Sequence, residues 1–189
     1  KASSMPGMVM PEDSKSGDNH DIAGMNMSEN KGSEQGKKIV NMDFIMQLNN
    51  ILDQYIILKN SLVHDDLKTT LKHSKNIQNA LSKVDMKLLS GDDHIKWMEI
   101  SGNILKGLTE MVSTDDLEQQ RNSFQTLSNN LYKAIKTFGL MGKIVYYQFC
   151  PMFNDNKGAY WLSEIEEIRN PYFGEKMLSC GETIESLNF

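Results

Sequence analysis

The chain has 189 residues, a net charge of −5 at pH 7 and 39% hydrophobic residues. Its length fits one globular domain plus a tail. An acidic chain without a basic patch is not expected to bind nucleic acid, and the lack of an apolar run of about 18 residues argues against membrane insertion of the folded domain.

Residues 1–38 are rich in Gly, Ser and charged residues and contain no aromatic residue. Such a segment buries too little apolar surface to offset its conformational entropy, which predicts a flexible tail. Because this tail has no core for methionine to fill, its thioethers are candidates for low-affinity capture of a soft metal ion, with an accident of composition as the alternative. The candidate ligands in the tail are Met5, Met8, Met10, His20, Met25 and Met27.

Hydrophobic residues then recur at helical spacing in four stretches, which predict helices over about 42–63, 67–90, 92–112 and 117–138. Connections of only a few residues favour antiparallel neighbours. We therefore expect an all-α fold, an up-down-up-down four-helix bundle, within a domain over 39–189. Close helix packing would explain Gly102 and Gly107 inside the third helix.

Residues 146–173 hold eight of the chain's 15 aromatic residues. Side chains of this size bury large areas, so we expect the C-terminal segment, about 143–189, to be ordered and to pack on the bundle. Turn-forming residues at 154–158 and at Asn170-Pro171 divide it into short pieces. The sequence thus predicts an aromatic-rich irregular segment.

Two pairs of sulfur residues lie in this segment, Cys150 with Met152 and Met177 with Cys180. Thiolate and thioether donors select soft ions such as Cu(I), and Ag(I) fits for the same reason. A chain that folds back could gather all four around one ion. Two alternatives stay open: a Cys150–Cys180 disulfide, which would stabilise the fold by roughly 3–4 kcal/mol, or free and inert thiols.

Signatures of catalysis are missing from the sequence. The four histidines show no zinc-binding spacing, and Glu164, Glu166 and Glu167 have no partner nucleophile. The chain also has no phosphate-binding glycine loop, no nucleophile elbow and no Cys-x-x-Cys motif. We therefore predict that the protein is not an enzyme.

Four motifs occur in order: Phe149-Cys-Pro-Met152, Gly158-Ala-Tyr-Trp-Leu-Ser163, Ile168-Arg-Asn-Pro-Tyr-Phe-Gly174 and Met177-Leu-Ser-Cys-Gly181. Together they resemble an uncharacterised bacterial domain family, common in Bacteroidetes. That family is found alone in exported or lipid-anchored proteins and as the C-terminal part of CusB-type copper/silver efflux adaptors. Its members often carry a polar residue such as His before Cys-Pro-Met, where this chain has Phe149, so a fifth ligand is missing.

The resemblance implies a periplasmic or envelope-exported protein, with lipid anchoring through a removed N-terminal segment as one option. Our leading hypothesis is a protein that binds Cu(I) or Ag(I) and serves metal efflux or resistance. The rival is a disulfide-stapled helical module that docks onto an efflux adaptor or another envelope protein and holds no metal. Within the motifs we expect a scaffold role for Trp161, Asn170, Pro171, Tyr172 and Gly174, and for Arg169 as the partner of an acid on the bundle. The oligomeric state is not predicted.

Overall fold

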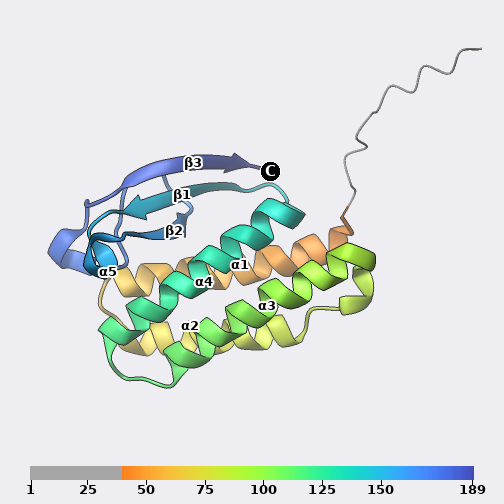
Figure 1. The fold of residues 1–189 in the computed structure, drawn as a ribbon, viewed down its shortest axis with the longest axis horizontal. Coiled ribbons are helices and arrows are strands. Elements are labelled where there is room, and N and C mark those ends of the chain that lie inside the picture. The colour runs from red at the N-terminus through yellow and green to blue at the C-terminus, as the bar shows by residue number, and fades with distance from the viewer. Residues whose placement is uncertain (1–39) are drawn as a thin grey trace, which may run out of the picture. The chain divides into compact units, whose positions relative to one another are not determined.

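A computed structural model describes residues 40–189, and the predicted tail with its candidate ligands lies outside them. Four long helices, each antiparallel to the next along the chain, form the predicted up-down-up-down bundle (Figure 1). In chain order they are α1 (Met42–Val63), α2 (Leu67–Ser82), α3 (Gly91–Val112) and α4 (Leu117–Phe138). Within residues 40–189, no helix is both long enough and apolar enough to cross a membrane.

Side chains at the helix starts explain three of the predicted beginnings. The side chain of Asn41 accepts a hydrogen bond from the backbone N–H of Asp43 at 2.8 Å, and Asp66 accepts one from Thr69 at 3.0 Å. Asp116 caps α4 in the same way. Each cap satisfies an N–H group that has no partner inside its helix.

The second helix ends earlier than predicted. It stops at Ser82, and the chain continues into a short 3₁₀ helix, η1 (Met86–Leu88). Asp85 explains the break, because its N–H donates to the side chain of Gln47 on α1 at 2.8 Å and its carboxylate accepts from Lys87 N–H at 2.9 Å. Residues 83–90 therefore leave the helix to cross to α3.

The C-terminal segment is not irregular, and the fold is not all-α. The segment forms a three-stranded antiparallel sheet in the order β2-β1-β3. The strands are β1 (Ile144–Cys150), β2 (Ala159–Ser163) and β3 (Glu182–Asn188), and the connections hold a short helix, α5 (Phe153–Asn156), and a 3₁₀ turn, η2 (Gly174–Met177). The aromatic and β-branched residues of β1 favour a strand, and β1 pairs with β2 on one side and with β3 on the other.

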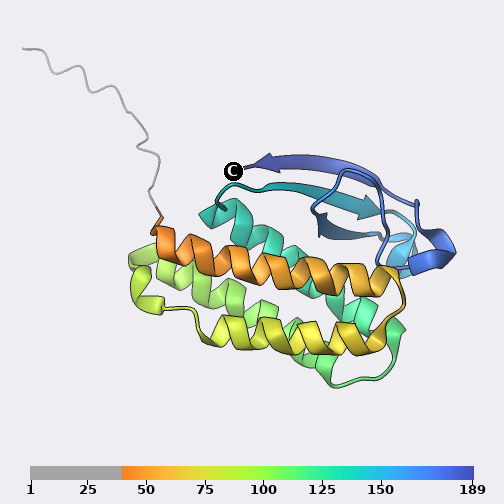
Figure 2. The same ribbon diagram turned by 180° about the vertical axis from the view of Figure 1, so that it is seen from behind.

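The sheet lies over α1 and α4, with β2 packed against both helices (Figures 1 and 2). Tyr55 of α1 is fully buried, and its hydroxyl accepts a hydrogen bond from Leu162 N–H of β2 at 3.0 Å. The hydroxyl of Tyr172 donates to the carbonyl oxygen of Tyr160 in the same strand. Two tyrosines thus satisfy backbone groups of an edge strand, which would otherwise be open to pairing with another chain.

Candidate functional site

The fold brings Cys150 and Cys180 together. Cys150 is the last residue of β1, and Cys180 is separated from the start of β3 by Gly181 alone. Because β1 and β3 are antiparallel neighbours with Phe149 opposite Glu182, both cysteines lie at the same end of this ladder. Their side chains are near enough for Cys150 to affect the titration of Cys180, and both are free thiols.

The two thiols differ in exposure. Cys150 is fully buried, whereas Cys180 is only partly buried, so the pair is reached from the side of Cys180. Burial and the neighbouring Cys150 side chain raise the pKa of the Cys180 thiol. Cys180 therefore holds its proton at neutral pH, and any metal ion that binds it must displace that proton.

Asn170 fixes the backbone around Cys180. Its side-chain amide donates to the carbonyl oxygen of Cys180 at 2.8 Å, and its backbone N–H donates to the carbonyl oxygen of Leu178 at 2.8 Å. The side-chain oxygen of Asn170 accepts from Tyr172 N–H at 2.8 Å. This fully buried side chain therefore has the scaffold role that the sequence predicted.

Two glycines allow the segment that carries Cys180 to approach its neighbours. At Gly181, which has φ +144°, a Cβ atom would lie 2.7 Å from the carbonyl oxygen of Phe149 and 2.9 Å from Cη2 of Trp161. At Gly174, which has φ +56°, a Cβ would lie 2.7 Å from the carboxylate of Asp65. Neither position has space for a larger side chain, and both backbone conformations favour glycine.

The arginine that ties this segment to the bundle is Arg121 of α4, not Arg169. Arg121 donates from Nε to the carbonyl oxygen of Pro171 and from Nη2 to that of Leu62, both at 2.9 Å, and it pairs with Asp65. Arg169 forms no ion pair within residues 40–189. Sequence reasoning missed Arg121 because one cation on an amphipathic helix is typical of a solvated surface.

The two candidate methionines lie close along the chain to the two cysteines. Met152 is in the turn after β1 and is 47% exposed. Met177 is the last residue of η2, is partly buried, and accepts a 3.1 Å hydrogen bond at its carbonyl oxygen from Cys180 N–H. The turns that contain the methionines thus begin or end at the thiol pair.

No group of three or more His, Cys, Asp and Glu side chains suited to a metal ion occurs in the described part of the chain. The donors at the candidate site are therefore the two thiols, with thioethers on the adjacent turns. This donor set is suited to a soft ion that accepts few ligands, and not to an ion that needs four nitrogen, oxygen or thiolate ligands.

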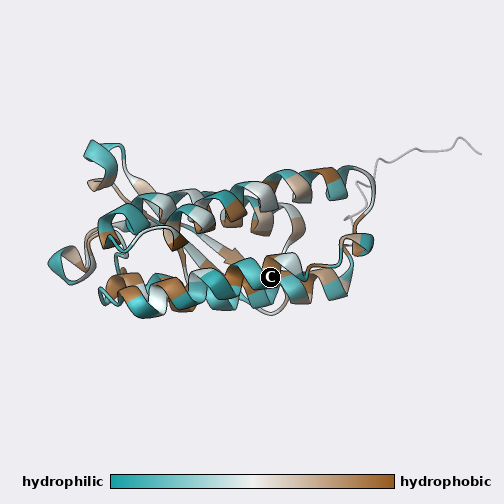
Figure 3. Cartoon of the chain, turned by 90° about the horizontal axis from the view of Figure 1, so that it is seen from below, coloured by the Kyte–Doolittle hydropathy of each residue, from teal (hydrophilic) through white to brown (hydrophobic). Residues whose placement is uncertain are grey.

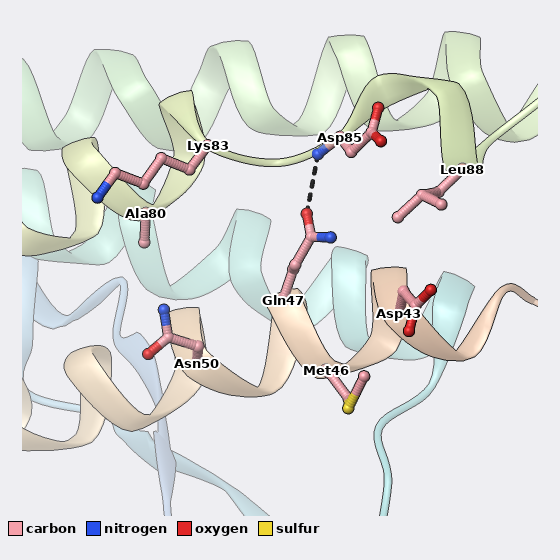
Figure 4. A pocket seen from close by; sticks show the side chains of 8 residues that line it. All are labelled: Asp43, Met46, Gln47, Asn50, Ala80, Lys83, Asp85 and Leu88. Atoms are coloured by element: carbon pink, nitrogen blue, oxygen red, sulfur yellow. Dashed lines mark hydrogen bonds between the residues drawn. The ribbon is translucent and has the colours of Figure 1, made fainter.

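A hollow of about 520 Å³ lies elsewhere, between α1 and the turn from α2 to η1 (Figure 4). The hydrogen bond from Asp85 N–H to Gln47 crosses it, and neither cysteine contributes to it. The lining residues are Asp43, Met46, Gln47, Asn50, Ala80, Lys83, Asp85 and Leu88. This mixture contains no nucleophile and no converging ligand set, so the thiol pair remains the better candidate site.

Residues 51–143 match the model of a family described as a protein of unknown function (DUF3347). The match covers most of α1 and all of α2 to α4 and ends just before β1, so the thiol pair lies outside it. It confirms that the helical part is similar to an uncharacterised helical-domain family. No curated protein and no solved structure matches the chain.

Proposed function

We propose that this protein binds Cu(I) or Ag(I) through the thiolates of Cys150 and Cys180, assisted by the thioethers of Met152 and Met177. One observation carries the proposal: two free thiols that are thirty positions apart in sequence are brought together at one end of the β1–β3 ladder. Soft sulfur donors prefer soft ions, and two thiolates with nearby thioethers suit Cu(I) better than Zn²⁺.

The wider role that we propose is metal handling in the cell envelope, in association with an efflux system. The support is the resemblance of the motifs around 146–181 to a domain that also occurs at the C-terminus of copper/silver efflux adaptors. In this proposal, Met5, Met8, Met10, His20, Met25 and Met27 collect or pass the ion. The protein acts as a binder and not as a catalyst.

The placement of both thiols at one end of the ladder also supports a second function, a helical interaction module stapled by a Cys150–Cys180 disulfide. Thiols in contact can close to a disulfide when an oxidant is present, and the staple would then hold the 164–181 segment as a docking surface. Thiol counting on protein prepared without reductant separates the two functions. A bridged pair that binds no Cu(I) after mild reduction would establish the module.

The direct test is competition for Cu(I) between the full chain and a coloured Cu(I) chelator in the presence of reductant. We expect Cys150→Ser and Cys180→Ser each to lower affinity by at least the roughly 10- to 100-fold typical of changes beside a metal ligand. Met152→Leu should lower it less. Met46→Leu is a matched control, because Met46 is also 47% exposed but lies on α1.

The proposal is overturned if the Cys150→Ser/Cys180→Ser double variant competes for Cu(I) as well as the wild-type chain does. Circular dichroism and thermal melting of each variant show whether the fold is intact. The tail is tested separately, by replacing its five methionines with alanine. A reduced number of bound ions, with unchanged affinity at the thiol pair, would support a collecting role for the tail.

A further inference from the structure

The two glycines of α3 differ in what surrounds them. A Cβ atom at Gly107 would lie 3.2 Å from Leu127 N and 3.2 Å from the carbonyl oxygen of Ser123, so close packing against α4 explains this glycine. A Cβ atom at Gly102 would meet nothing within 4 Å. Because glycine inside a helix is destabilising relative to alanine, the packing of residues 40–189 gives no reason for Gly102.

Gly102 lies in a row of exposed apolar residues on α3. Ile95 is 66% exposed, Met98 54% and Leu105 46%. With Gly102 they follow a spacing of three, four and three residues, which places them along one face of the helix, opposite the buried face of Trp97 and Ile104. We name these four residues the α3 stripe.

A hollow of about 270 Å³ lies beside the α3 stripe, in the groove between α2 and α3, and is lined by Met98, Gly102, Leu105 and Leu81. Figure 3 views the molecule from this side, and hydrophobic positions alternate with hydrophilic ones along the helices. Helices that pack in pairs insert a large side chain into such a gap in the facing helix. The α3 stripe therefore has both the projecting residues and the gap that a facing helix requires.

We propose that the α3 stripe packs on the same face of α3 in a second copy of this chain, antiparallel and about a twofold axis. In the proposed register, Leu105 of the second copy faces Gly102, and the reverse contact follows by symmetry. Met98 and Ile95 then face Thr109 and Val112 of the second copy, which continue the same spacing.

Glu99 and Lys106 are both exposed and flank the same edge of the stripe. In an antiparallel helix pair, residues on that edge of one helix face residues on the same edge of the other. Glu99 of each copy therefore faces Lys106 of the other copy, which gives two ion pairs.

This self-complementarity identifies a second copy as the partner. Within residues 99–106, one twofold rotation places the small Gly102 opposite the large Leu105 of the second copy. The same rotation places the acidic Glu99 opposite the basic Lys106. A helix of an unrelated protein could pack on the α3 stripe if the stripe were merely apolar. Such a partner would not require Gly102 to complement Leu105 in size, or Glu99 to complement Lys106 in charge, within the same helix. The interface therefore joins two identical surfaces.

Charge reversal in the full chain tests the proposal, with sedimentation velocity over a concentration series at low salt. We expect wild type to dimerise, and Glu99→Lys and Lys106→Glu each to weaken the dimer by about tenfold or more, because like charges then face each other. An equimolar mixture of the two single variants should dimerise again, since each heterodimer contains two opposite-charge pairs. The Glu99→Lys/Lys106→Glu double variant should also recover.

Two further variants test the apolar contacts. Gly102→Gln places a long side chain in the gap from a Cβ position with no neighbour within 4 Å, and it should abolish the dimer while the monomer stays folded. Lys133→Glu is the control, because Lys133 is exposed on α4, away from the stripe, and its reversal should change nothing. A wild-type chain that stays monomeric throughout, or single variants that dimerise like wild type, would overturn the proposal.

Discussion

Arg121 on α4 donates a 2.9 Å hydrogen bond from Nε to the carbonyl oxygen of Pro171, on the segment that leads to Cys180. The same guanidinium contacts Leu62 and Asp65 where α1 turns toward α2. One side chain thus joins α4 and the α1–α2 turn, at one end of the bundle, to the segment that positions the thiol pair. A planar guanidinium with several donors suits this role better than an ammonium group does.

We expect Arg121→Ala to lower the free energy of unfolding by about 2–3 kcal/mol, because it leaves buried carbonyl groups without donors. Arg121→Lys should recover less than half of this loss, since one ammonium cannot reach all three partners. Urea denaturation provides the measurement. Arg169→Ala is the matched control and should cost less than about 0.5 kcal/mol. Equal losses for both alanine variants would contradict the role given to Arg121.

Gly181→Ala should destabilise the protein and move Cys180 away from Cys150. Its Cβ would lie 2.7 Å from the Phe149 carbonyl oxygen, in a backbone conformation with φ +144° that only glycine adopts easily. We expect a loss of about 2–3 kcal/mol and slower disulfide formation under a mild oxidant. Gly142→Ala is the control for backbone strain alone, since Gly142 has φ +62° but its Cβ would meet nothing within 4 Å, and it should leave disulfide formation unchanged. Unchanged disulfide formation in Gly181→Ala would show that the approach does not depend on this glycine.

The sequence predicts the helical bundle well because its signals are local. Caps such as Asn41 and Asp116 lie within a few residues of the groups that they satisfy. The end of α2 was missed because it depends on Gln47, which is 38 residues from Asp85. The sheet was missed because β1 is a single run of strand-forming residues, and such a run shows no partner strand until distant segments pair with it.

The candidate site, like the fold, could be predicted from the sequence only in part. The motifs were sufficient to predict that Cys150 and Cys180 lie near each other, and the pairing of β1 with β3 places both at one end of the ladder. The supporting contacts of Arg121 and Tyr55 span 50 and 107 residues, so no local pattern reveals them. Whether the thiols hold an ion or form a bridge depends on redox conditions, which residue patterns do not encode.

Lys59 and Glu164 form an ion pair whose two ends should respond differently to mutation. Lys59 is fully buried, and its Nζ lies 3.2 Å from Oε2 of Glu164, whose side chain is 41% exposed. Burial lowers the pKa of Lys59, so keeping the ammonium group charged costs free energy of folding. We expect Lys59→Met to be neutral or stabilising by about 1 kcal/mol, and Glu164→Gln to cost about 1–3 kcal/mol after allowing for solvent screening.

The same pair predicts a loss of stability in acid. Partial burial would raise the pKa of Glu164, but the hydrogen bond from Asn60 and the charge of Lys59 outweigh it and hold the pKa below its ordinary value. Its stabilising contribution is therefore present above about pH 4.3 and lost as pH falls through the lowered pKa. Urea midpoints measured from pH 7 to pH 3 should fall more steeply for wild type than for Glu164→Gln. Parallel curves would contradict this.

The thiol of Cys180 should titrate above its ordinary range. Burial and the adjacent Cys150 side chain raise its pKa, so alkylation by iodoacetamide at pH 7 should be slower than for an exposed cysteine and should accelerate only above about pH 8.5. Mass spectrometry of the alkylated peptide measures the profile. Cys150→Ser should shift the midpoint down only in part, because burial, the larger cause, remains. A midpoint below the ordinary value would contradict this arrangement.

Gly102→Ala and Gly107→Ala should change stability in opposite directions, although both replace a glycine inside α3. Alanine favours a helix over glycine by about 0.8–1 kcal/mol, and the open space at Gly102 lets that gain appear in full. At Gly107, the new methyl group would lie 3.2 Å from two backbone atoms of α4, so α3 and α4 must move apart. This movement should cost more than the gain in helix propensity, and we expect a net loss of stability of about 1–2 kcal/mol. Thermal melting at a protein concentration low enough to keep the chain monomeric measures both. A gain at Gly107 would show that α3 and α4 are less closely packed than the structure has them, whereas a loss at Gly102 would mean that its side has a neighbour within the monomer.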